Sequence, residues 1–278
     1  MGRDDHDQQL RRDLEWAVSS PPLMRGATLA PGHACHGLPG PEDCYSGHRV
    51  GYYFESLIDY WLRSELAVEM LAHRQQIQDA GRTIGELDFV FRDRQGRTCH
   101  WEVAVKFYLY CADRRVADSH FIGPNAGDTF ERKWERLQTK QLPLCRHVFP
   151  EVSECSALVK GRIFYHPDQP RPSSLPDGLM PDHLRGIWLR ASELSWLESA
   201  GPQSTWNFRI LLKPFWLAPV RLDGSASPPS SLGQLRAELA RHFDNSNHPV
   251  LVSCLSRVDG GWEEGERLFV VADGWPEL

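Results

Sequence analysis

Hydrophobic and polar positions repeat along the N-terminal half of the chain with two different periods. Apolar residues that recur about every 3.6 positions predict helices over residues 11–19, 51–72 and 128–141. Strict alternation over 83–110 predicts two strands. The Gly/Pro/His/Cys-rich segment 26–48 and the segment 123–128 are expected to be loops. Helices and strands that follow one another in this way indicate an α/β protein.

The C-terminal half has the same mixed character. Strand-like apolar runs cover 156–166 and 206–220, and a helix is expected over 231–243. The runs 249–258 and 267–272, joined through a Gly- and Glu-rich segment, predict a hairpin. Pro- and Ser-rich stretches interrupt the chain at 167–182 and 223–230.

These elements predict an α/β core with a C-terminal α/β extension. The expected parts are an N-terminal helix and loop (1–48), the core (49–150) and the extension packed on it (151–278).

The composition argues against several classes of protein. A net charge of −6 argues against a protein that coats nucleic acid indiscriminately, although the segment 91–115 holds six basic residues against three acidic ones. The polar N-terminus is not a signal peptide, and no apolar stretch reaches the roughly 20 residues that span a bilayer. Seven cysteines without a CxxC pair favour a reducing compartment. We therefore expect a cytoplasmic protein without a membrane partner.

Three acidic residues occupy unusual places in the core. In the helix 51–72, Glu55 falls on the flank of the apolar face, where a carboxylate needs a partner. In the first strand, Glu86 and Asp88 share one face. For Glu55, an ion pair with an arginine is the alternative to a functional role.

The second strand presents Glu102, Ala104 and Lys106 on one face. If residues 93–97 form the turn, Asp88 lies directly across from Glu102. Two carboxylates in that position repel each other, and a divalent cation such as Mg²⁺ between them would reverse the sign of the interaction. The alternative is a buried ion cluster that Lys106 neutralises without metal.

A helical Glu, a strand Asp, and a strand Glu followed by a Lys on the same face resemble the PD-(D/E)XK nuclease superfamily. More closely, the segments GYYFESLIDYWL, GELDFVFRD, HWEVAVKFYL, FIGPNAGD and KQLPL are similar to domain-of-unknown-function family eighteen-fifty-three, an uncharacterised bacterial group. The resemblance implies a restriction-endonuclease-like core, that is, a central mixed sheet flanked by helices.

The resemblance also implies roles for these residues. Asp88 and Glu102 would ligate Mg²⁺ or Mn²⁺, with Glu55 and Glu86 as further ligands, and Lys106 would orient the attacking water. In the superfamily the lysine stands two residues after the second acid, where this chain has Ala104. Lys106 lies about 7 Å further along the strand, and this departure bears on activity more than on fold.

The helix 128–141 carries a group of polar side chains beside its apolar stripe. Lys133, Arg136 and Lys140 fall within about 60° of one another, and Gln141 belongs to the same set. Cations beside a carboxylate–metal site would hold a phosphate backbone, and a solvated basic face is the alternative.

The sequence therefore predicts a metal-dependent phosphodiesterase that acts on DNA in preference to RNA. Two alternatives stay open: a catalytically inactive nucleic-acid-binding protein on the same fold, and a protein-interaction module with a structural ion cluster. The oligomeric state is not predicted. The group His33, Cys35, His36, Cys44 and His48 matches no zinc-ligand spacing, so we interpret it as loop composition.

Overall fold

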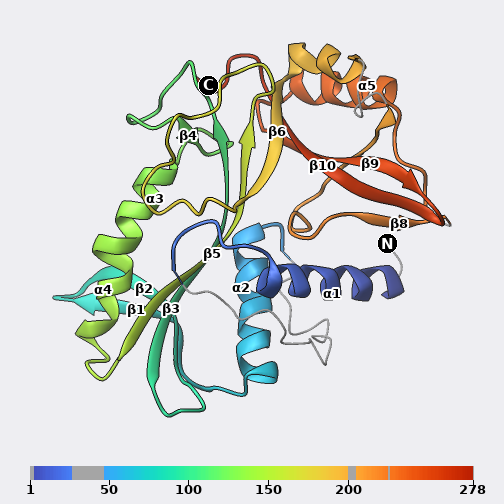
Figure 1. Ribbon diagram of the computed structural model, residues 1–278. Coiled ribbons are helices and arrows are strands. Elements are labelled where there is room, and N and C mark those ends of the chain that lie inside the picture. Colours follow the sequence, from blue (N-terminus) through green and yellow to red (C-terminus); the bar gives the residue numbers. More distant parts are fainter. Residues whose placement is uncertain (1–2, 27–46, 200–204, 225, 278) are drawn as a thin grey trace. The chain divides into compact units, whose positions relative to one another are not determined.

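The computed structural model describes residues 3–26, 47–199, 205–224 and 226–277 (Figure 1). The chain divides into two compact units that interleave along the sequence. Unit 1 comprises residues 1–106, 131–161 and 175–183, and unit 2 comprises residues 107–130, 162–174 and 184–278. These units are not consecutive blocks of the chain, unlike the predicted parts with boundaries after residues 48 and 150.

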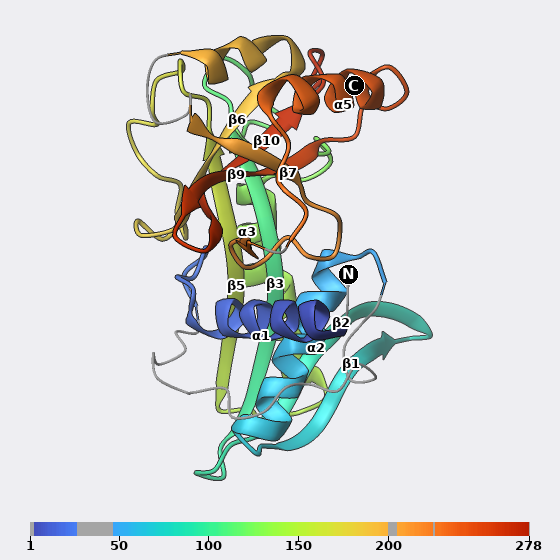
Figure 2. The same cartoon turned by 90° about the vertical axis from the view of Figure 1, so that its right-hand side faces the viewer.

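Unit 1 contains a sheet with strand order β1-β2-β3-β5. Its strands are β1 (Glu69–Asp79), β2 (Arg82–Arg92) and the first parts of β3 (Thr98–Tyr110) and β5 (Glu154–Tyr165). The helices of unit 1 are α1 (Arg3–Ser19), α2 (Val50–Tyr60) with its π-helical continuation η1 (Trp61–Glu65), and a run formed by α3 (Phe130–Arg136), η2 (Leu137–Gln141), α4 (Leu142–Leu144) and η3 (Cys145–His147). Figure 2 shows α1 and α2 on one side of these strands and α3 on the other.

Unit 2 contains the second part of β5 and the strands that follow it, in the order β5-β6-β10-β9-β7, with β4 beside β3 and β8 beside β10. Its further elements are β4 (Phe121–Ile122), β6 (Leu184–Arg190), the 3₁₀ helix η4 (Ala191–Glu198), β7 (Asn207–Ile210), β8 (Arg221–Asp223), α5 (Leu232–Phe243), β9 (Val250–Val258) and β10 (Gly261–Val271). β6 runs parallel to β5 and to β10, whereas β9 and β10 are antiparallel. The predicted mixed sheet flanked by helices is therefore confirmed.

The predicted central hairpin is confirmed with its register. Arg92 pairs with Thr98, and Asp93 and Arg97 close the turn through a backbone hydrogen bond of 3.0 Å. Gly96 has a φ of +78°, a conformation that glycine adopts without steric cost.

The observed helix is shorter at its C-terminal end than the predicted helix 51–72. Helical structure stops at Glu65, Ala67 has a positive φ of 48°, and the chain then enters β1. β1 pairs antiparallel with β2 along its length, so tertiary pairing overrides the helical pattern of this segment.

Two further predictions in the C-terminal half need correction. Of the strand predicted over 206–220, only β7 forms, because Pro214 and Pro219 lack the N–H that a ladder requires. The Gly- and Glu-rich connection of the last hairpin is mostly strand, since β10 already begins at Gly261. The helix predicted over 231–243 is confirmed as α5, whose Ser231 side chain caps its first turn.

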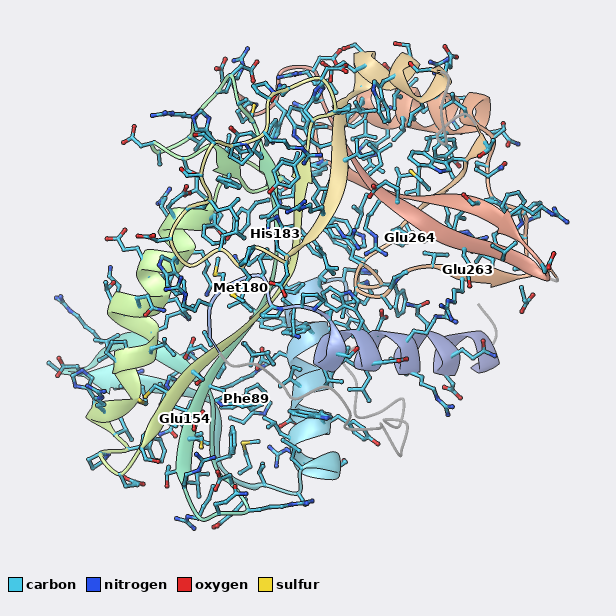
Figure 3. All side chains as sticks on the ribbon, viewed as in Figure 1. Phe89, Glu154, Met180, His183, Glu263 and Glu264 are labelled. Atoms are coloured by element: carbon cyan, nitrogen blue, oxygen red, sulfur yellow. The ribbon has the colours of Figure 1, made fainter. Side chains whose placement is uncertain are left out.

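A buried arginine organises one end of unit 2. The guanidinium of Arg267 donates to both oxygens of Glu264 and to three backbone carbonyl oxygens, those of Trp216, Leu217 and Ala218. Arg267 is only 1 % exposed, and Figure 3 labels its partner Glu264 on β10. Because all five guanidinium N–H groups have acceptors, the charge is buried with full compensation.

One glycine in unit 1 permits a close backbone approach. Gly161 of β5 has a φ of +145°, and a Cβ at this position would lie 1.8 Å from the carbonyl oxygen of Lys106 on β3. Only glycine fits this contact. In the described part of the chain, no helix is long and apolar enough to cross a membrane.

Candidate carboxylate site

The two acidic residues of the hairpin lie on the same face of the unit 1 sheet. β2 and β3 pair from Arg92 with Thr98 up to Phe89 with Trp101, and one step further along this register brings Asp88 opposite Glu102. Cross-strand neighbours have their Cβ atoms about 5 Å apart. The register and the charge of Glu102 that acts on Asp88 agree with two neighbouring carboxyl groups, and their role as a site stays a prediction.

Asp88 is half-buried and close to other negative charge. Its Oδ2 accepts a hydrogen bond of 2.9 Å from the backbone N–H of Val103. Burial, reinforced by the negative charge of Glu102, raises the pKa of Asp88 to about 8. In the absence of a cation, Asp88 therefore carries a proton at neutral pH.

This shift predicts how stability depends on pH. Asp88 keeps its proton in the folded protein up to about pH 8, whereas an unfolded chain loses it near pH 4. The folded state binds the extra proton across this interval, so its free energy of unfolding falls as pH rises, by up to about 1.4 kcal/mol per pH unit. In EDTA, Asp88→Asn should exceed the wild type in urea midpoint by a small margin at pH 5 and by a larger margin at pH 8. Equal midpoints at both pH values would contradict this assignment.

Glu102 is buried, and each of its carboxylate oxygens has a partner. Oε1 lies 3.0 Å from Nε2 of His100, and Oε2 accepts a hydrogen bond from the side-chain amide of Gln141. Gln141 in turn accepts a hydrogen bond of 2.8 Å from Nζ of Lys133. A continuous hydrogen-bonded chain therefore joins Lys133 to His100 through Gln141 and Glu102.

Lys133 lies close to the other charged groups of this site. Burial and the nearby charge of Lys106 lower the pKa of the Lys133 ammonium below its ordinary value, while Glu102 and Asp88 act in the opposite direction. Lys106, at the end of β3 in unit 1, is half-buried. Two lysines therefore flank the carboxylate pair, and the sequence had indicated only Lys106 for this position.

The predicted basic set on the helix thus divides into two parts. Lys133 and Gln141 belong to the hydrogen-bonded chain at Glu102, whereas Arg136 and Lys140 are exposed. Contact of Arg136 and Lys140 with phosphate stays a prediction.

Glu55 reaches the sheet from the opposite side. Its Oε1 lies 3.1 Å from Nε2 of His73, and both carboxylate oxygens accept hydrogen bonds from Arg74. The ring of His73 stacks on Phe89, which strand alternation directs away from the face of Asp88. The ion pair with an arginine is therefore present, and a metal-ligand role for Glu55 stays a prediction.

The backbone of β1 explains how two neighbouring residues reach one carboxylate. In a regular strand, His73 and Arg74 would point to opposite faces. Arg74 has a φ of +52°, which breaks the alternation and turns its side chain to Glu55. Burial alone would raise the pKa of Glu55, but the hydrogen bonds from His73 and Arg74 outweigh it and hold the pKa below its ordinary value.

The remaining predicted ligand, Glu86, is exposed on the same strand as Asp88. Sequence reasoning missed His100, although the alternation that places Glu102 on its face places residue 100 there too. It also missed His73 and Arg74, because the predicted helix covered only the start of β1 and residues 73–79 were assigned to no element. Of the His/Cys-rich loop, His33, Cys35, His36 and Cys44 lie outside the described residues.

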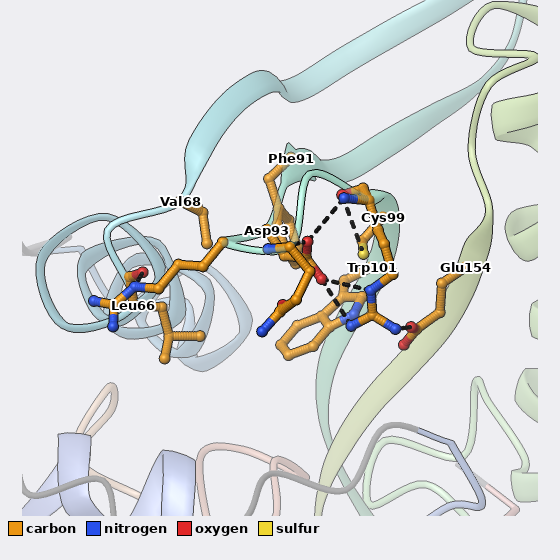
Figure 4. Close-up of a pocket in the computed structure, with 10 residues that line it drawn as sticks. Leu66, Val68, Phe91, Asp93, Cys99, Trp101 and Glu154 are labelled. Carbon is orange, nitrogen blue, oxygen red and sulfur yellow. Dashed lines mark hydrogen bonds and ion pairs between the residues drawn. The ribbon is translucent and has the colours of Figure 1, made fainter.

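A separate pocket opens on the other face of the hairpin. It has a volume of about 330 Å³, and Figure 4 shows Trp101 and Phe91 in its wall beside Asp93 and Glu154. Trp101 follows His100 directly, so the strand alternation puts this pocket on the opposite side of the sheet from Glu102. The pocket contains none of the residues of the carboxylate pair.

A family model described as Domain of unknown function (DUF1853) matches residues 12–271 of the chain. No curated protein and no solved structure matches it.

Proposed function

The chain belongs to the DUF1853 family, whose description assigns no activity, and from its own side chains we propose that it is a metal-dependent phosphodiesterase that hydrolyses DNA or, as second choice, RNA. The observation that carries this proposal is the carboxylate pair Asp88 and Glu102 on one face of a hairpin. The resemblance of unit 1 to a PD-(D/E)XK core with a restriction-endonuclease-like fold is part of the same proposal.

The donor set fits Mg²⁺ or Mn²⁺. These hard cations are typically held by one or two carboxylates with water in the remaining positions. Among the described residues, no donor occupies Oδ1 of Asp88, so this oxygen can face a cation. Glu102 can also ligate the cation while it keeps its hydrogen bonds with His100 and Gln141. Carboxylate ligands are commonly hydrogen-bonded to neighbouring groups.

A bound divalent cation would supply Lewis acidity and lower the pKa of a coordinated water. Asp88 and Glu102 would hold it, and the backbone N–H of Val103 fixes the orientation of Asp88. Because burial and Glu102 keep Asp88 protonated up to about pH 8, metal uptake at neutral pH requires Asp88 to release a proton. Metal affinity should therefore rise between pH 6 and pH 8.

The two lysines supply the positive charge that Ala104 cannot. Lys106 is the residue that we assign to orienting the attacking water and offsetting negative charge on the phosphate. Lys133 supports it from the helix, and its lowered pKa makes its proton easier to transfer than that of an exposed lysine.

We propose nucleic acid as the partner because exposed positive charge is concentrated on one helical run beside the carboxylate pair. Arg136 and Lys140 are exposed on the same helical run as Lys133 and can contact phosphates on either side of the scissile bond. The net charge of −6 argues against phosphate contacts over the whole surface of the protein. The cysteines that the structure describes have free thiols, which supports the cytoplasm as the compartment.

The test combines metal binding with cleavage. Millimolar Mn²⁺ should raise the melting temperature of the full chain, because a ligand at 100 times its Kd stabilises the native state by about 2.7 kcal/mol. With Mn²⁺ the protein should cleave single- or double-stranded DNA, or RNA, in a gel assay. Asp88→Asn should lose both responses, whereas Lys106→Met should lose only cleavage.

Asp79→Asn is the matched control, because it removes the same charge from an exposed strand position of unit 1. It should behave as the wild type. A Mn²⁺ shift without cleavage of any substrate would favour the inactive nucleic-acid-binding protein. Absence of a Mn²⁺ shift in the wild type would overturn the metal site and favour the structural ion cluster.

A further inference from the structure

Two cysteines and a histidine from separate elements meet behind the carboxylate pair, all within unit 1. They are His100 on β3, Cys145 at the start of η3 and Cys155 on β5. One ligand atom of each lies within 4.8 Å of the others, and the two sulfurs are 3.2 Å apart. Among the described residues, no other group of three His, Cys, Asp or Glu side chains brings its ligand atoms this close together.

His100 offers one ring nitrogen to this group. The residue has no exposed surface, and its Nε2 is engaged with Glu102 at 3.0 Å. Its Nδ1 is buried and has no hydrogen-bond partner in the described part of the chain. If Nε2 carries the proton and donates it to Glu102, Nδ1 carries a lone pair, which is the tautomer that a metal ligand needs.

We propose that His100, Cys145 and Cys155 form a binding site for a single thiophilic cation, with Zn²⁺ as the ion that this donor set fits. Two thiolates and one imidazole are ligands for zinc, whereas Mg²⁺ and Mn²⁺ prefer oxygen. Three protein ligands leave a fourth tetrahedral position for water. The site is thus chemically distinct from the carboxylate pair, and it does not depend on the proposed nuclease function.

The geometry needs little adjustment to hold the ion. Two thiolates on one tetrahedral Zn²⁺ lie about 3.7 Å apart, given Zn–S bonds of about 2.3 Å. The 3.2 Å between the sulfurs can widen to this value through side-chain rotation. Binding releases one proton from each thiol to solvent, so the bound ion and its two thiolates are neutral together.

The surroundings suit a closed site with one entrance. Cys145 belongs to a buried apolar cluster with Leu144 and Val90, against which Cys155 packs. Cys145 has no exposed surface, but Cys155 is half-buried and offers the side from which an ion can enter. Apolar burial of two thiols is common without metal, but the orphaned Nδ1 of His100 is not explained by packing.

The proposal links the two sites through one side chain. A cation on Nδ1 of His100 would fix the proton on Nε2 and hold it toward Glu102, as in the carboxylate–histidine–metal arrangements of zinc proteins. Zinc would therefore act as a positioning element for Glu102.

The test uses the full chain, purified with reductant, stripped with chelator and titrated with Zn²⁺ against a chromophoric chelator. We expect one Zn²⁺ per chain with a Kd below about 1 µM. Cys145→Ser, Cys155→Ser and His100→Gln should each weaken binding by at least about 100-fold, because the loss of a direct ligand costs no less than the loss of an outer group that orients a ligand, which is about 10- to 100-fold. Co²⁺ in place of Zn²⁺ should give thiolate-to-metal absorption in the wild type, and this absorption should be weaker or absent in the three ligand variants.

Cys99→Ser is the matched control, because Cys99 is buried, precedes His100 on the same strand and points to the other face. It should bind Zn²⁺ as the wild type does. Should a ligand variant fail to fold, the wild type alone decides: Zn²⁺ must slow alkylation of Cys155, measured by mass spectrometry. Zinc that binds equally well to all variants, alkylation that Zn²⁺ does not change, or a Cys145–Cys155 disulfide in the reduced preparation would overturn the proposal.

Discussion

Arg267→Met is expected to destabilise the protein by about 3–5 kcal/mol, the usual cost of removing one partner of a buried ion pair. The substitution leaves Glu264 buried without its cation and removes the donors to the carbonyl oxygens of residues 216–218. Urea unfolding followed by far-ultraviolet circular dichroism measures the change.

The neighbouring exposed pair is the control for this effect. Arg221 and Glu263 lie 3.4 Å apart and are largely exposed, so Arg221→Met should change stability by less than about 1 kcal/mol. Adding Glu264→Leu to the Arg267→Met variant should recover part of the loss, because it removes the uncompensated charge. A loss below 1 kcal/mol for Arg267→Met alone would contradict the role given to this cluster.

Gly161→Ala should cost about 3 kcal/mol or more, since it combines a backbone conformation that L-residues avoid with a severe clash. The added Cβ would lie 1.8 Å from the carbonyl oxygen of Lys106, so β3 and β5 would have to move apart. Because Lys106 is assigned to catalysis, the same change should also lower any cleavage activity measured below the melting temperature.

Gly233→Ala is the matched control, because Gly233 lies in α5 and a Cβ there meets nothing within 4 Å. It should stabilise the protein by up to about 1 kcal/mol through the higher helix propensity of alanine. Equal effects of the two substitutions would show that the β3–β5 contact tolerates separation.

The hairpin and its register could be predicted from the sequence because every determinant is local. The alternation sets the faces of Asp88 and Glu102, and Gly96 with Asp93 closes a turn of fixed length. Register in such a hairpin follows from turn geometry and pattern. Both kinds of information are contained in about twenty consecutive residues.

β1 could not be predicted, because its pattern is ambiguous and its reason to be a strand lies in β2. Its polar residues suit a sheet edge, but they also continue the amphipathic pattern of the helix before them. Because residues 73–79 were assigned to no element, the contacts of Glu55 with His73 and Arg74 were not predicted.

The group of His100, Cys145 and Cys155 is a different case. The two cysteines are far closer to each other in the fold than in the sequence, and their spacing follows no metal-ligand motif. Convergence of three elements is a property of tertiary structure, so no reading of local pattern could have found it.

The interleaving of the two units has a consequence for synthesis on the ribosome. Unit 1 contains no residue after His183, so every side chain of the carboxylate pair and of the proposed zinc site leaves the exit tunnel before β6, α5, β9 and β10 do. Nascent chains generally fold from the N-terminal side as units become complete. Zinc uptake by chains stalled after residue 183 has emerged would therefore report whether the site is assembled co-translationally.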